Sequence, residues 1–313
     1  MKVVMINDCA YVGETLIKYL PKELEVVHLK RSRGFLSKTF GILWKIMRSK
    51  GDVYHVHYLL QDCYLALKFG KQPVIGHAHG TDLRSSLKHK IWSRFVRYNL
   101  ERCEKILVST PDLLSIAREY REDAEYIPNP VDTNVFYPKP VAFHGGEVKV
   151  LIAAKCDWKL KGTDIALYAL GKLKDKVKVF VIRYGRDFDK TVALARELNL
   201  NLEVLPKISH EKMCKYYWMT DVVIDQFKFG VLGMVSLEAI ACGRPVITFV
   251  SSEYASYKDF PIKDIKTQED IIRVFNGNLE KLWRAEYKYL KRNHDPEKVA
   301  TKLAGIYKAI SSA

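Results

Sequence analysis

Short apolar runs rich in β-branched residues alternate with helical patterns along the 313 residues. Such runs predict buried strands, and their alternation with helices predicts parallel, doubly wound sheets. A proline-rich segment at 129–140 divides the runs into two sets and indicates a linker. The chain is therefore expected to form two α/β domains. The expected strands are Lys2–Ile6, Glu25–Leu29, Asp52–Val56, Pro73–Ala78, Lys105–Ser109 and Ala124–Ile127, then Lys149–Ala154, Val177–Arg183, Leu202–Leu205, Val222–Asp225 and Val246–Phe249.

The segment 221–249 says most about a ligand. A strand is followed by a loop with Gly230 and Gly233, then by a helix over Val235–Cys242 whose one charged residue is Glu238. A helix N-terminus behind a glycine loop favours phosphate, and a carboxylate on an apolar helix needs hydroxyl or cationic partners. Ligands of such sheets bind beyond the carboxyl ends of the strands. The segment therefore predicts a pocket for a nucleotide sugar.

Five segments occur in the order found in glycosyltransferase family 4, which has the GT-B fold, and each resembles a motif of that family. The resemblance implies two Rossmann-like domains that face each other across a cleft. Residues 1–140 would form the acceptor side and residues 141–290 the nucleotide-sugar side. Residues 291–313 would form a helix, Pro296–Ile310, that crosses back to the first domain. The segments are HAHGTDLR (77–84), STPDLL (109–114), YIPNPVDTNVFYP (126–138), Lys155 with Lys161-Gly162, and LEAIACGRPVI (237–247).

The resemblance also implies an activity and its residues. A hexose would pass from a nucleotide-diphosphate sugar to an acceptor with retention at the anomeric carbon, by front-face attack. Glu238 would hold the ribose, and His79 would lie near the donor sugar and steer the acceptor. Lys155 and Lys161 would hold the diphosphate and stabilise the charge that develops on it. Further expected contacts are Gly13, Gly162, Arg183, Ile208, Asp225, Gly230, Gly233, Met234 and Val235.

The chain departs from the family pattern at two places. Lysine stands at 155 where arginine is usual, and Ala154 replaces a glycine. Lysine is a point charge without a bidentate fork, so this contact is expected either to be weaker than that of arginine or to be shared with Lys159. Gly230 occupies the place of the first glutamate of the Glu-x7-Glu motif, and DQFKFGVLG at 225–233 resembles a variant with Asp-Gln and G-x-x-G. Two roles stay open for Asp225: structural support, or contact with the sugar.

The first half holds further polar candidates at expected strand ends. The backbone N–H groups of the loop 7–13 are expected to meet the phosphates or the acceptor. We expect His77 to point away from His79, and His55 and His57 to pack in the core or at a sheet edge, with a place in the cleft as the alternative.

Basic residues give the chain a formal net charge of +15, unevenly spread. Residues 30–50 hold seven basic side chains and no acidic one, and residues 84–105 hold seven more. Within a helix expected over Phe40–Ser49, the apolar residues Phe40, Leu43, Trp44 and Met47 form one stripe. That mixture suits an anionic membrane surface, and hence a lipid-linked or membrane-surface glycan acceptor. The alternative is a soluble acceptor, with Trp44 in the core. No nucleic-acid-binding motif accompanies the charge.

Several classes of protein are disfavoured. The six cysteines are scattered, so neither a zinc site nor a disulfide framework is expected. DFD at 187–189 resembles the metal-binding D-x-D of other glycosyltransferases, but lysines already serve the phosphates, so we expect no metal and no other cofactor. The first residues predict a strand rather than a signal peptide, and no apolar run reaches the roughly 18 residues of a membrane span. We expect a cytoplasmic protein, free or on the cytoplasmic face of a membrane.

Two other functions fit the same residues. A GT-B sugar-nucleotide 2-epimerase would use the donor without an acceptor. The second is a non-catalytic protein that binds membranes or nucleic acid and uses a GT-B scaffold whose donor site has degenerated. The missing first glutamate is the observation that favours it.

Overall fold

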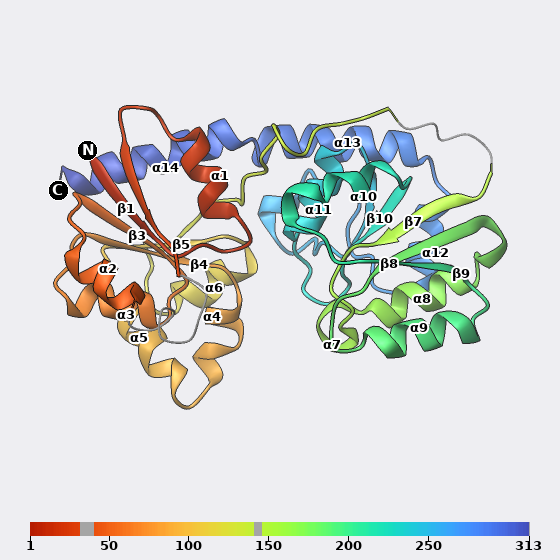
Figure 1. The fold of residues 1–313 in the computed structure, drawn as a ribbon, viewed down its shortest axis with the longest axis horizontal. Helices are drawn as coiled ribbons and strands as arrows, with labels where there is room; N and C mark the ends of the chain where they lie inside the picture. The colour runs from red at the N-terminus through yellow and green to blue at the C-terminus, as the bar shows by residue number, and fades with distance from the viewer. Residues whose placement is uncertain (32–40, 141–145, 313) are drawn as a thin grey trace. The chain divides into compact units, whose positions relative to one another are not determined.

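The computed structural model describes residues 1–31, 41–140 and 146–312, which form two compact units (Figure 1). The first unit comprises Met1–Pro130 and Asn293–Ala313, and the second comprises Val131–Arg292. Each unit is built around one parallel sheet, so the expected α/β class is confirmed.

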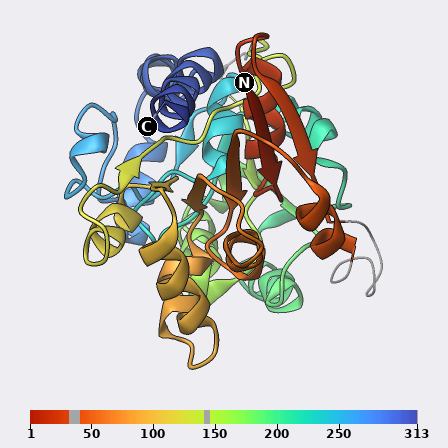
Figure 2. The ribbon, with the colours of Figure 1, turned by 90° about the vertical axis from the view of Figure 1, so that its left-hand side faces the viewer.

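The first unit holds a six-stranded parallel sheet in the order β2-β1-β3-β4-β5-β6. Its central strands are buried on both faces, which explains why they are short and apolar. Helices α2, α3 and α5 cover one face, against Tyr54 and Val56 of β3. Helix α14 packs against α1 and β3 on the other (Figures 1 and 2). The elements are β1 Lys2–Ile6, α1 Val12–Tyr19, β2 Glu25–Leu29, α2 Ile42–Arg48, β3 Val53–His57, α3 Gln61–Lys68, β4 Val74–Ala78, α4 Thr81–Arg84, η2 Ser86–Lys88, α5 Trp92–Arg102, β5 Lys105–Val108, α6 Asp112–Arg118, β6 Glu125–Tyr126 and α14 Pro296–Ser311.

The second unit holds a five-stranded parallel sheet in the order β11-β10-β7-β8-β9. Strand β10 lies in register with β7 on one side and β11 on the other, so the loop after β10 starts from the middle of the sheet. The elements are β7 Val148–Ile152, α7 Trp158–Lys161, α8 Thr163–Gly171, η3 Lys174–Lys176, β8 Val177–Ile182, α9 Phe188–Glu197, β9 Asn201–Leu205, η4 His210–Lys212, α10 Cys214–Trp218, β10 Val222–Ile224, α11 Met234–Ala241, β11 Val246–Ile247, η5 Ala255–Tyr257, α12 Gln268–Phe275 and α13 Leu279–Asn293.

All eleven expected strands form, with ends that shift by one or two residues. The helix expected over Phe40–Ser49 is α2, Ile42–Arg48; Phe40 lies outside the described residues, as do Phe35, Leu36 and Lys38 of the same basic stretch. Residues Ile42 and Ile46 form its buried face, and Trp44 is 59% exposed. Packing of Trp44 in the core, the alternative drawn from the sequence, is therefore wrong. All six cysteines are free thiols.

Residues 131–140, expected at the end of the first domain, are bonded within the second unit. The backbone N–H of Lys139 donates to the Cys242 carbonyl, and the indole of Trp218 donates to the Tyr137 carbonyl. The fully buried Arg244 donates to the carbonyls of Tyr217, Thr220 and Lys139. Arg244 of the GRPVI segment thus ties the linker to the body of this unit.

Candidate active site

Helix α11 begins where the loop after β10 ends, and Asp225 lies at this junction. Its Oδ2 accepts from the Ser236 hydroxyl at 2.7 Å, and its Oδ1 lies 4.0 Å from Nζ of Lys161. Oδ1 is buried and has no hydrogen-bond partner among the described residues. A Cβ at Gly233 would lie 3.0 Å from Oδ2, so glycine leaves room beside the carboxylate. The Lys161 cation and the buried Asp225 carboxylate therefore lie together at the N-terminus of α11, whose first residues are Met234 and Val235.

The carboxylate of Glu238 lies one turn further along α11 and is already engaged on both oxygens. Nε2 of His210 lies 2.6 Å from Oε1, and the Tyr217 hydroxyl donates to Oε2 at 3.0 Å. The glutamate side chain is 4% exposed. Burial, and to a lesser extent the neighbouring Glu238 carboxylate, holds the pKa of Tyr217 well above its usual value. Tyr217 therefore keeps its proton and donates a hydrogen bond.

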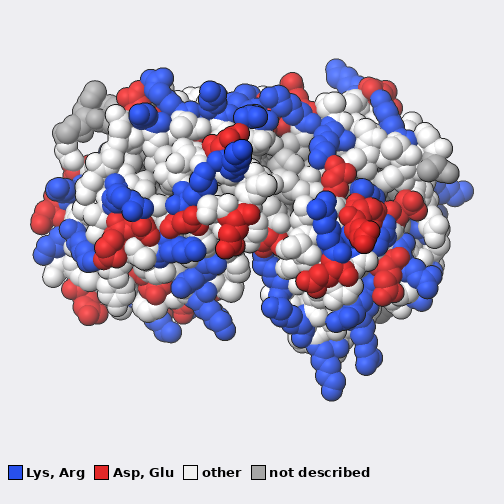
Figure 3. All heavy atoms as spheres, turned by 180° about the vertical axis from the view of Figure 1, so that it is seen from behind, with Lys and Arg blue, Asp and Glu red and all other residues white. Residues whose placement is uncertain are grey.

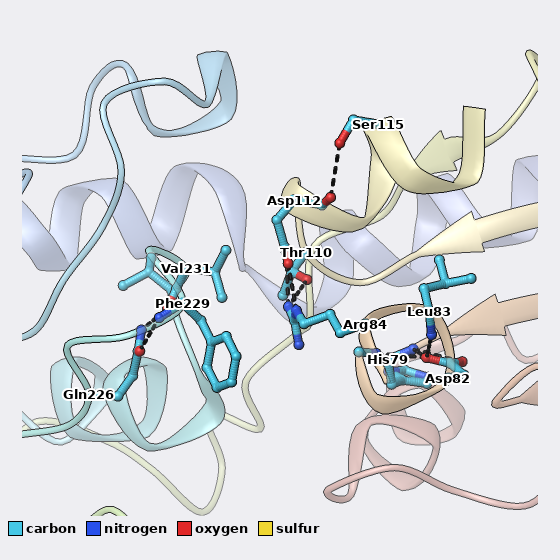
Figure 4. Close-up of polar contacts among 12 residues, drawn as sticks. His79, Asp82, Leu83, Arg84, Thr110, Asp112, Ser115, Gln226, Phe229 and Val231 are labelled. Carbon is cyan, nitrogen blue, oxygen red and sulfur yellow. Dashed lines mark hydrogen bonds and ion pairs between the residues drawn. The ribbon is translucent and has the colours of Figure 1, made fainter. Parts of the chain in front are cut away.

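The amide of Gln226 fixes the G-x-x-G loop. Its Nε2 donates to the Val231 carbonyl, while its Oε1 accepts from the backbone N–H groups of Lys228 and Phe229 (Figure 4). Gly230 has φ +63°, a conformation that glycine adopts at no steric cost. Gln226 thus fixes the shape of the loop and does not face a ligand. The sequence alone did not indicate this role, because it depends on contacts made in the folded chain.

Lys161 ends α7, and Gly162 follows with φ +71°. A Cβ at Gly162 would lie 3.3 Å from Cβ of Phe227, so the glycine lets the loop after β10 approach. The Phe227 N–H donates to the Lys161 carbonyl, which fixes the two segments together. Lys155 is half-buried and makes no hydrogen bond or ion pair with the described residues. Both expected diphosphate cations therefore follow β7.

The segment after β8 lies beside Lys155. The N–H of Cys156 donates to the Tyr184 carbonyl, and a Cβ at Gly185 would clash with the Cys156 backbone at 2.3 Å. Nζ of Lys207 lies 4.8 Å from the centre of the Tyr184 ring. Arg183 is exposed here, and Ile208 follows β9 in the loop that leads to His210. The expected contact after β8 thus lies next to the end of β7, and the one after β9 lies one strand further along the sheet.

In the first unit, the HGTD loop is held from within by Asp82. The buried Asp82 carboxylate accepts from the backbone N–H groups of His79, Gly80, Leu83 and Leu59 (Figure 4). Burial raises the pKa of Asp82, and these four N–H groups oppose the rise. The aspartate therefore sets the course of the chain at the end of β4.

Arg84 joins two motifs that are far apart in the sequence. Its Nε and Nη2 donate to the two oxygens of Asp112 at 2.6 and 2.9 Å, and Nη2 also donates to the Thr110 hydroxyl (Figure 4). Gly80 has φ +127°, and a Cβ there would lie 2.2 Å from Arg84. The two-pronged pairing of Arg84 with Asp112 thus joins HAHGTDLR to STPDLL.

Four histidines form a row on the face of the first sheet that packs on α14. Nδ1 of His55 lies 2.6 Å from the Tyr307 hydroxyl, and Nε2 of His55 lies 3.1 Å from Nδ1 of His77. Nδ1 of His57 lies 2.7 Å from Nε2 of His79. The expectation that His77 points away from His79 is wrong, because residues two apart on a strand share a face and their ring centres are 4.3 Å apart.

The loop 7–13 was expected to offer free backbone N–H groups to the phosphates or the acceptor, but Asp8 already binds two N–H groups at the start of α1. The carboxylate of Asp8 accepts from the backbone N–H groups of Gly13 and Glu14 at 2.8 and 3.1 Å. These donors of the α1 N-terminus are therefore occupied, and an anion here would meet a like charge. The loop suits hydroxyl groups better than phosphate.

A hollow of about 190 Å³, lined by both polar and apolar side chains, lies in the first unit at the ends of β1 and β3. Its wall holds the buried Asp62, which accepts two hydrogen bonds from Arg31 and one from Asn7. His57 and Tyr58 also line it. Sequence reasoning missed this hollow because Asp62 follows no motif.

Candidate metal ligands gather in two places. Asp187 of the DFD triplet accepts from the Trp158 N–H at 3.0 Å and lies near Lys190. The Trp158 hydrogen bond, and after it the charge of Lys190, lowers the pKa of Asp187. This carboxylate caps α7. In the part of the chain that the structure describes, one group could offer three metal ligands: His55, His57 and His77, with nitrogens within 4.8 Å of one another.

Comparison with known proteins agrees with this arrangement. The family model described as "Glycosyltransferase Family 4" matches residues 15–135, and "Glycosyl transferases group 1" matches residues 136–257. The chain belongs to glycosyltransferase family 4. Its GT-B fold is that of sucrose-phosphate synthase from Thermosynechococcus elongatus, at a TM-score of 0.75 and 15% identity over 100% of both chains. HepE from Anabaena, in complex with UDP and glucose, gives a TM-score of 0.72 at 12% identity, over 99% of this chain and 100% of that one.

Two curated relatives match the chain over only part of their own length. N-acetyl-α-D-glucosaminyl L-malate synthase from Bacillus anthracis is 23% identical over 64% of this chain, and the match spans 57% of that protein. An uncharacterized glycosyltransferase from Methanocaldococcus jannaschii is 26% identical over 71% of this chain and 63% of its own length. The chain thus spans roughly six tenths of the length of these relatives.

Proposed function

We propose that this family 4 protein is a retaining hexosyltransferase that uses a nucleotide-diphosphate sugar as donor and needs no metal ion. One observation carries the proposal: Lys161, Asp225 and Ser236 meet at the N-terminus of α11, and Glu238 lies one turn along the same helix. A helix N-terminus with a nearby cation suits a diphosphate, and a carboxylate suits the hydroxyls of a ribose. Lys155 and Arg183 add positive charge beside it.

In this proposal Lys161 and Lys155 stabilise the leaving diphosphate as negative charge develops on it. Oδ1 of Asp225 is buried beside Lys161 and makes no hydrogen bond among the described residues, so a sugar hydroxyl that reaches it would satisfy this oxygen. The other oxygen, held by Ser236, fixes the orientation of the carboxylate. Asp225 is therefore proposed to contact the sugar, and the leaving phosphate to take the proton of the acceptor.

The acceptor side is proposed to lie at the carboxyl edge of the first sheet. The hollow at Asn7, Arg31 and Asp62 offers amide, guanidinium and carboxylate groups, which suit a hydroxyl-rich glycan. The Asp8 carboxylate on the loop 7–13 adds an acceptor for hydroxyl groups near Gly13. We propose a glycan or lipid-linked acceptor on this basis.

Contact with an anionic membrane is part of the proposal. Ile91 and Trp92 are 60% and 37% exposed next to the exposed Lys88 and Lys90, and Trp44 and Met47 are exposed beside Arg48. Figure 3 shows Lys and Arg side chains projecting from the end of the first unit that carries η2 and the start of α5. Apolar side chains among basic ones suit anionic head groups. No helix among the described residues has the length and apolarity needed to cross a bilayer.

Thermal stabilisation by a panel of nucleoside diphosphates tests the donor, because a ligand that binds only the native state raises its stability by mass action. UDP is the first candidate, since the HepE structures hold UDP and UDP-glucose. Turnover of the matching sugar nucleotide is then measured with and without glycan acceptors. Turnover that requires an acceptor supports a transferase, whereas isomerisation of the donor alone would make the protein an epimerase. Stabilisation by none of the nucleotides would contradict both.

A further inference from the structure

The row of four histidines, on β3, on β4 and just after β4, lies outside the proposed donor site. His55, His57 and His77 are at most 1% exposed, and burial is the first cause that holds the pKa of all four imidazoles low, with His57 at about 3. All four are therefore neutral near pH 7. Each neutral ring carries one proton, on either Nδ1 or Nε2, and which nitrogen holds it decides what the ring can do.

Ring orientation disfavours a metal in this row. A metal ligand offers its lone pair in the plane of the ring, so three ligand planes must converge on one point. Here the ring of His57 stacks on that of His55, with 4.7 Å between centres and 19° between planes, so the lone pairs of these two rings lie in separate, near-parallel planes. The separations of 2.7 and 3.1 Å between nitrogens are hydrogen-bond lengths. The row is a set of hydrogen-bonded pairs.

The pair of His57 and His79 has two possible proton arrangements. Nε2 of His57 is buried without a partner among the described residues. If His79 donated to Nδ1 of His57, the proton of His57 would sit on that Nε2 as an unpaired buried N–H. If His57 donates instead, Nε2 is a bare lone pair. Orphaned buried N–H groups are rarer than under-used acceptors, so donation from His57 is favoured. Gly13 is the close neighbour of this nitrogen: a Cβ there would lie 3.0 Å from it.

We propose that His57 is a positioning residue: its Nδ1–H donates to Nε2 of His79 and so holds the His79 proton on Nδ1. His79 is half-buried and follows β4, and with Nε2 occupied its remaining polar ring atom is Nδ1. In this tautomer His79 presents a hydrogen-bond donor. It binds an oxygen of the donor sugar or the acceptor and does not remove a proton. The inference rests on the proposed function for what His79 meets, but not for the tautomer.

The tautomer is measured directly on the full-length protein. With ¹⁵N-labelled histidine, long-range ¹H–¹⁵N correlation spectra at pH 7 distinguish an Nδ1–H ring from an Nε2–H ring, and a His79→Gln sample identifies the His79 signals. We expect both His79 and His57 as Nδ1–H forms. An Nε2–H form of His79 overturns the proposal. So does a stoichiometric divalent metal bound through His57 in the purified protein.

Variants separate positioning from packing. His57→Asn places an amide N–H near the position of Nδ1 and should keep the His79 tautomer, with kcat within about threefold of wild type. His57→Leu removes the donor, and should mix the His79 tautomers and lower kcat about tenfold, the value of one hydrogen bond, with little change in donor KM. His55→Leu is the matched control: it is equally buried on β3 but pairs with Tyr307 and His77. A His79 tautomer that shifts as much in His55→Leu as in His57→Leu overturns the proposal.

The outcomes are separable from those of the proposed function. If the protein proves to bind no nucleotide sugar, the wild-type spectrum still decides the tautomer. If sugar transfer is observed with His79 in the Nε2–H form, the transferase stands and the positioning role of His57 fails. Should His57→Leu not fold, the wild-type spectrum and His57→Asn decide.

Discussion

Nε2 of His210 lies 2.6 Å from Oε1 of Glu238, so the glutamate proposed for the ribose is already bonded before any nucleotide binds. His210 is on η4, just after the loop that follows β9, and its side chain is 21% exposed. Because His210 is the more exposed of the two partners of Glu238, a ribose hydroxyl can take its place while Tyr217 keeps hold of Oε2. Nucleotide binding is then expected to move His210.

Glu238→Gln should weaken binding of the nucleoside diphosphate and of the sugar nucleotide alike, because both contain the ribose. Loss of a charge-assisted hydrogen bond is worth about 1.5–3 kcal/mol, or about tenfold or more in Kd. Titration calorimetry of both ligands measures it. Glu211→Gln, exposed on η4, is the matched control and should bind as wild type does. Unchanged Kd values with a lower Tm would assign Glu238 a structural role.

Lys161→Ala should lower turnover more than it lowers donor affinity. Its Nζ lies 4.0 Å from Asp225, and its contact with the diphosphate strengthens as charge develops in the transition state. A drop in kcat of about one to two decades is expected from a lost charged contact. Lys172→Ala is the control, since that lysine forms an exposed pair with Glu269. A kcat/KM equal to that of wild type would remove Lys161 from the site.

Activity should survive EDTA, because lysines and the N-terminus of α11 are proposed to hold the phosphates. Asp187 accepts from the Trp158 N–H and lies beside Arg186 and Lys190, so positive charge already neighbours this carboxylate. Initial rates are compared before and after chelation and after Mg²⁺ or Mn²⁺ is restored. A loss of activity that either ion reverses would return DFD to the metal role.

The strands along the chain and the helix behind the glycine loop follow from local patterns, and the sequence predicted them. The contact of Lys161 with Asp225 was not predicted. Partners distant in the chain were not predictable in this way. His210, 28 residues from Glu238, and Arg84, 28 residues from Asp112, meet them only through the fold. The orientation of His77 was within reach, since the two-residue period of a strand places His77 and His79 on one face. The linker 129–140 has the composition of a connector, yet buried Arg244 draws it into the second unit.

Stability should fall below about pH 6.5, the usual pKa of histidine. The pKa of His57 is lowered to about 3 by burial, so between pH 6.5 and pH 3 the unfolded state binds a proton that the native state does not. Stability therefore rises with pH in this window. For His57 alone the loss between pH 6.5 and pH 5 is about 2 kcal/mol.

Urea unfolding at pH 7, 6 and 5 measures this dependence. The free energy of unfolding of His57→Asn should change less with pH than that of wild type, because the variant lacks one titrating group. The difference between the two proteins is the informative quantity, because Glu286, whose pKa is raised by burial, contributes with the opposite sign in both. Parallel slopes would show that His57 titrates normally.

Anionic vesicles should bind the protein, and neutral ones should not. The motive is the exposure of Trp44 at 59% and Ile91 at 60% among basic residues of the first unit, with the Arg48 guanidinium 4.5 Å from the Trp44 ring. Each basic side chain near an anionic surface contributes about 1 kcal/mol, and salt should weaken the binding because it screens these charges. Co-sedimentation with vesicles of neutral and of anionic lipid is the measurement.

Trp44→Ser and Ile91→Ser should each reduce binding, whereas Tyr168→Ser, which removes a 43% exposed aromatic from the second unit, should not. Equal sedimentation with both lipids at low salt would contradict the membrane contact and leave a glycan acceptor in solution.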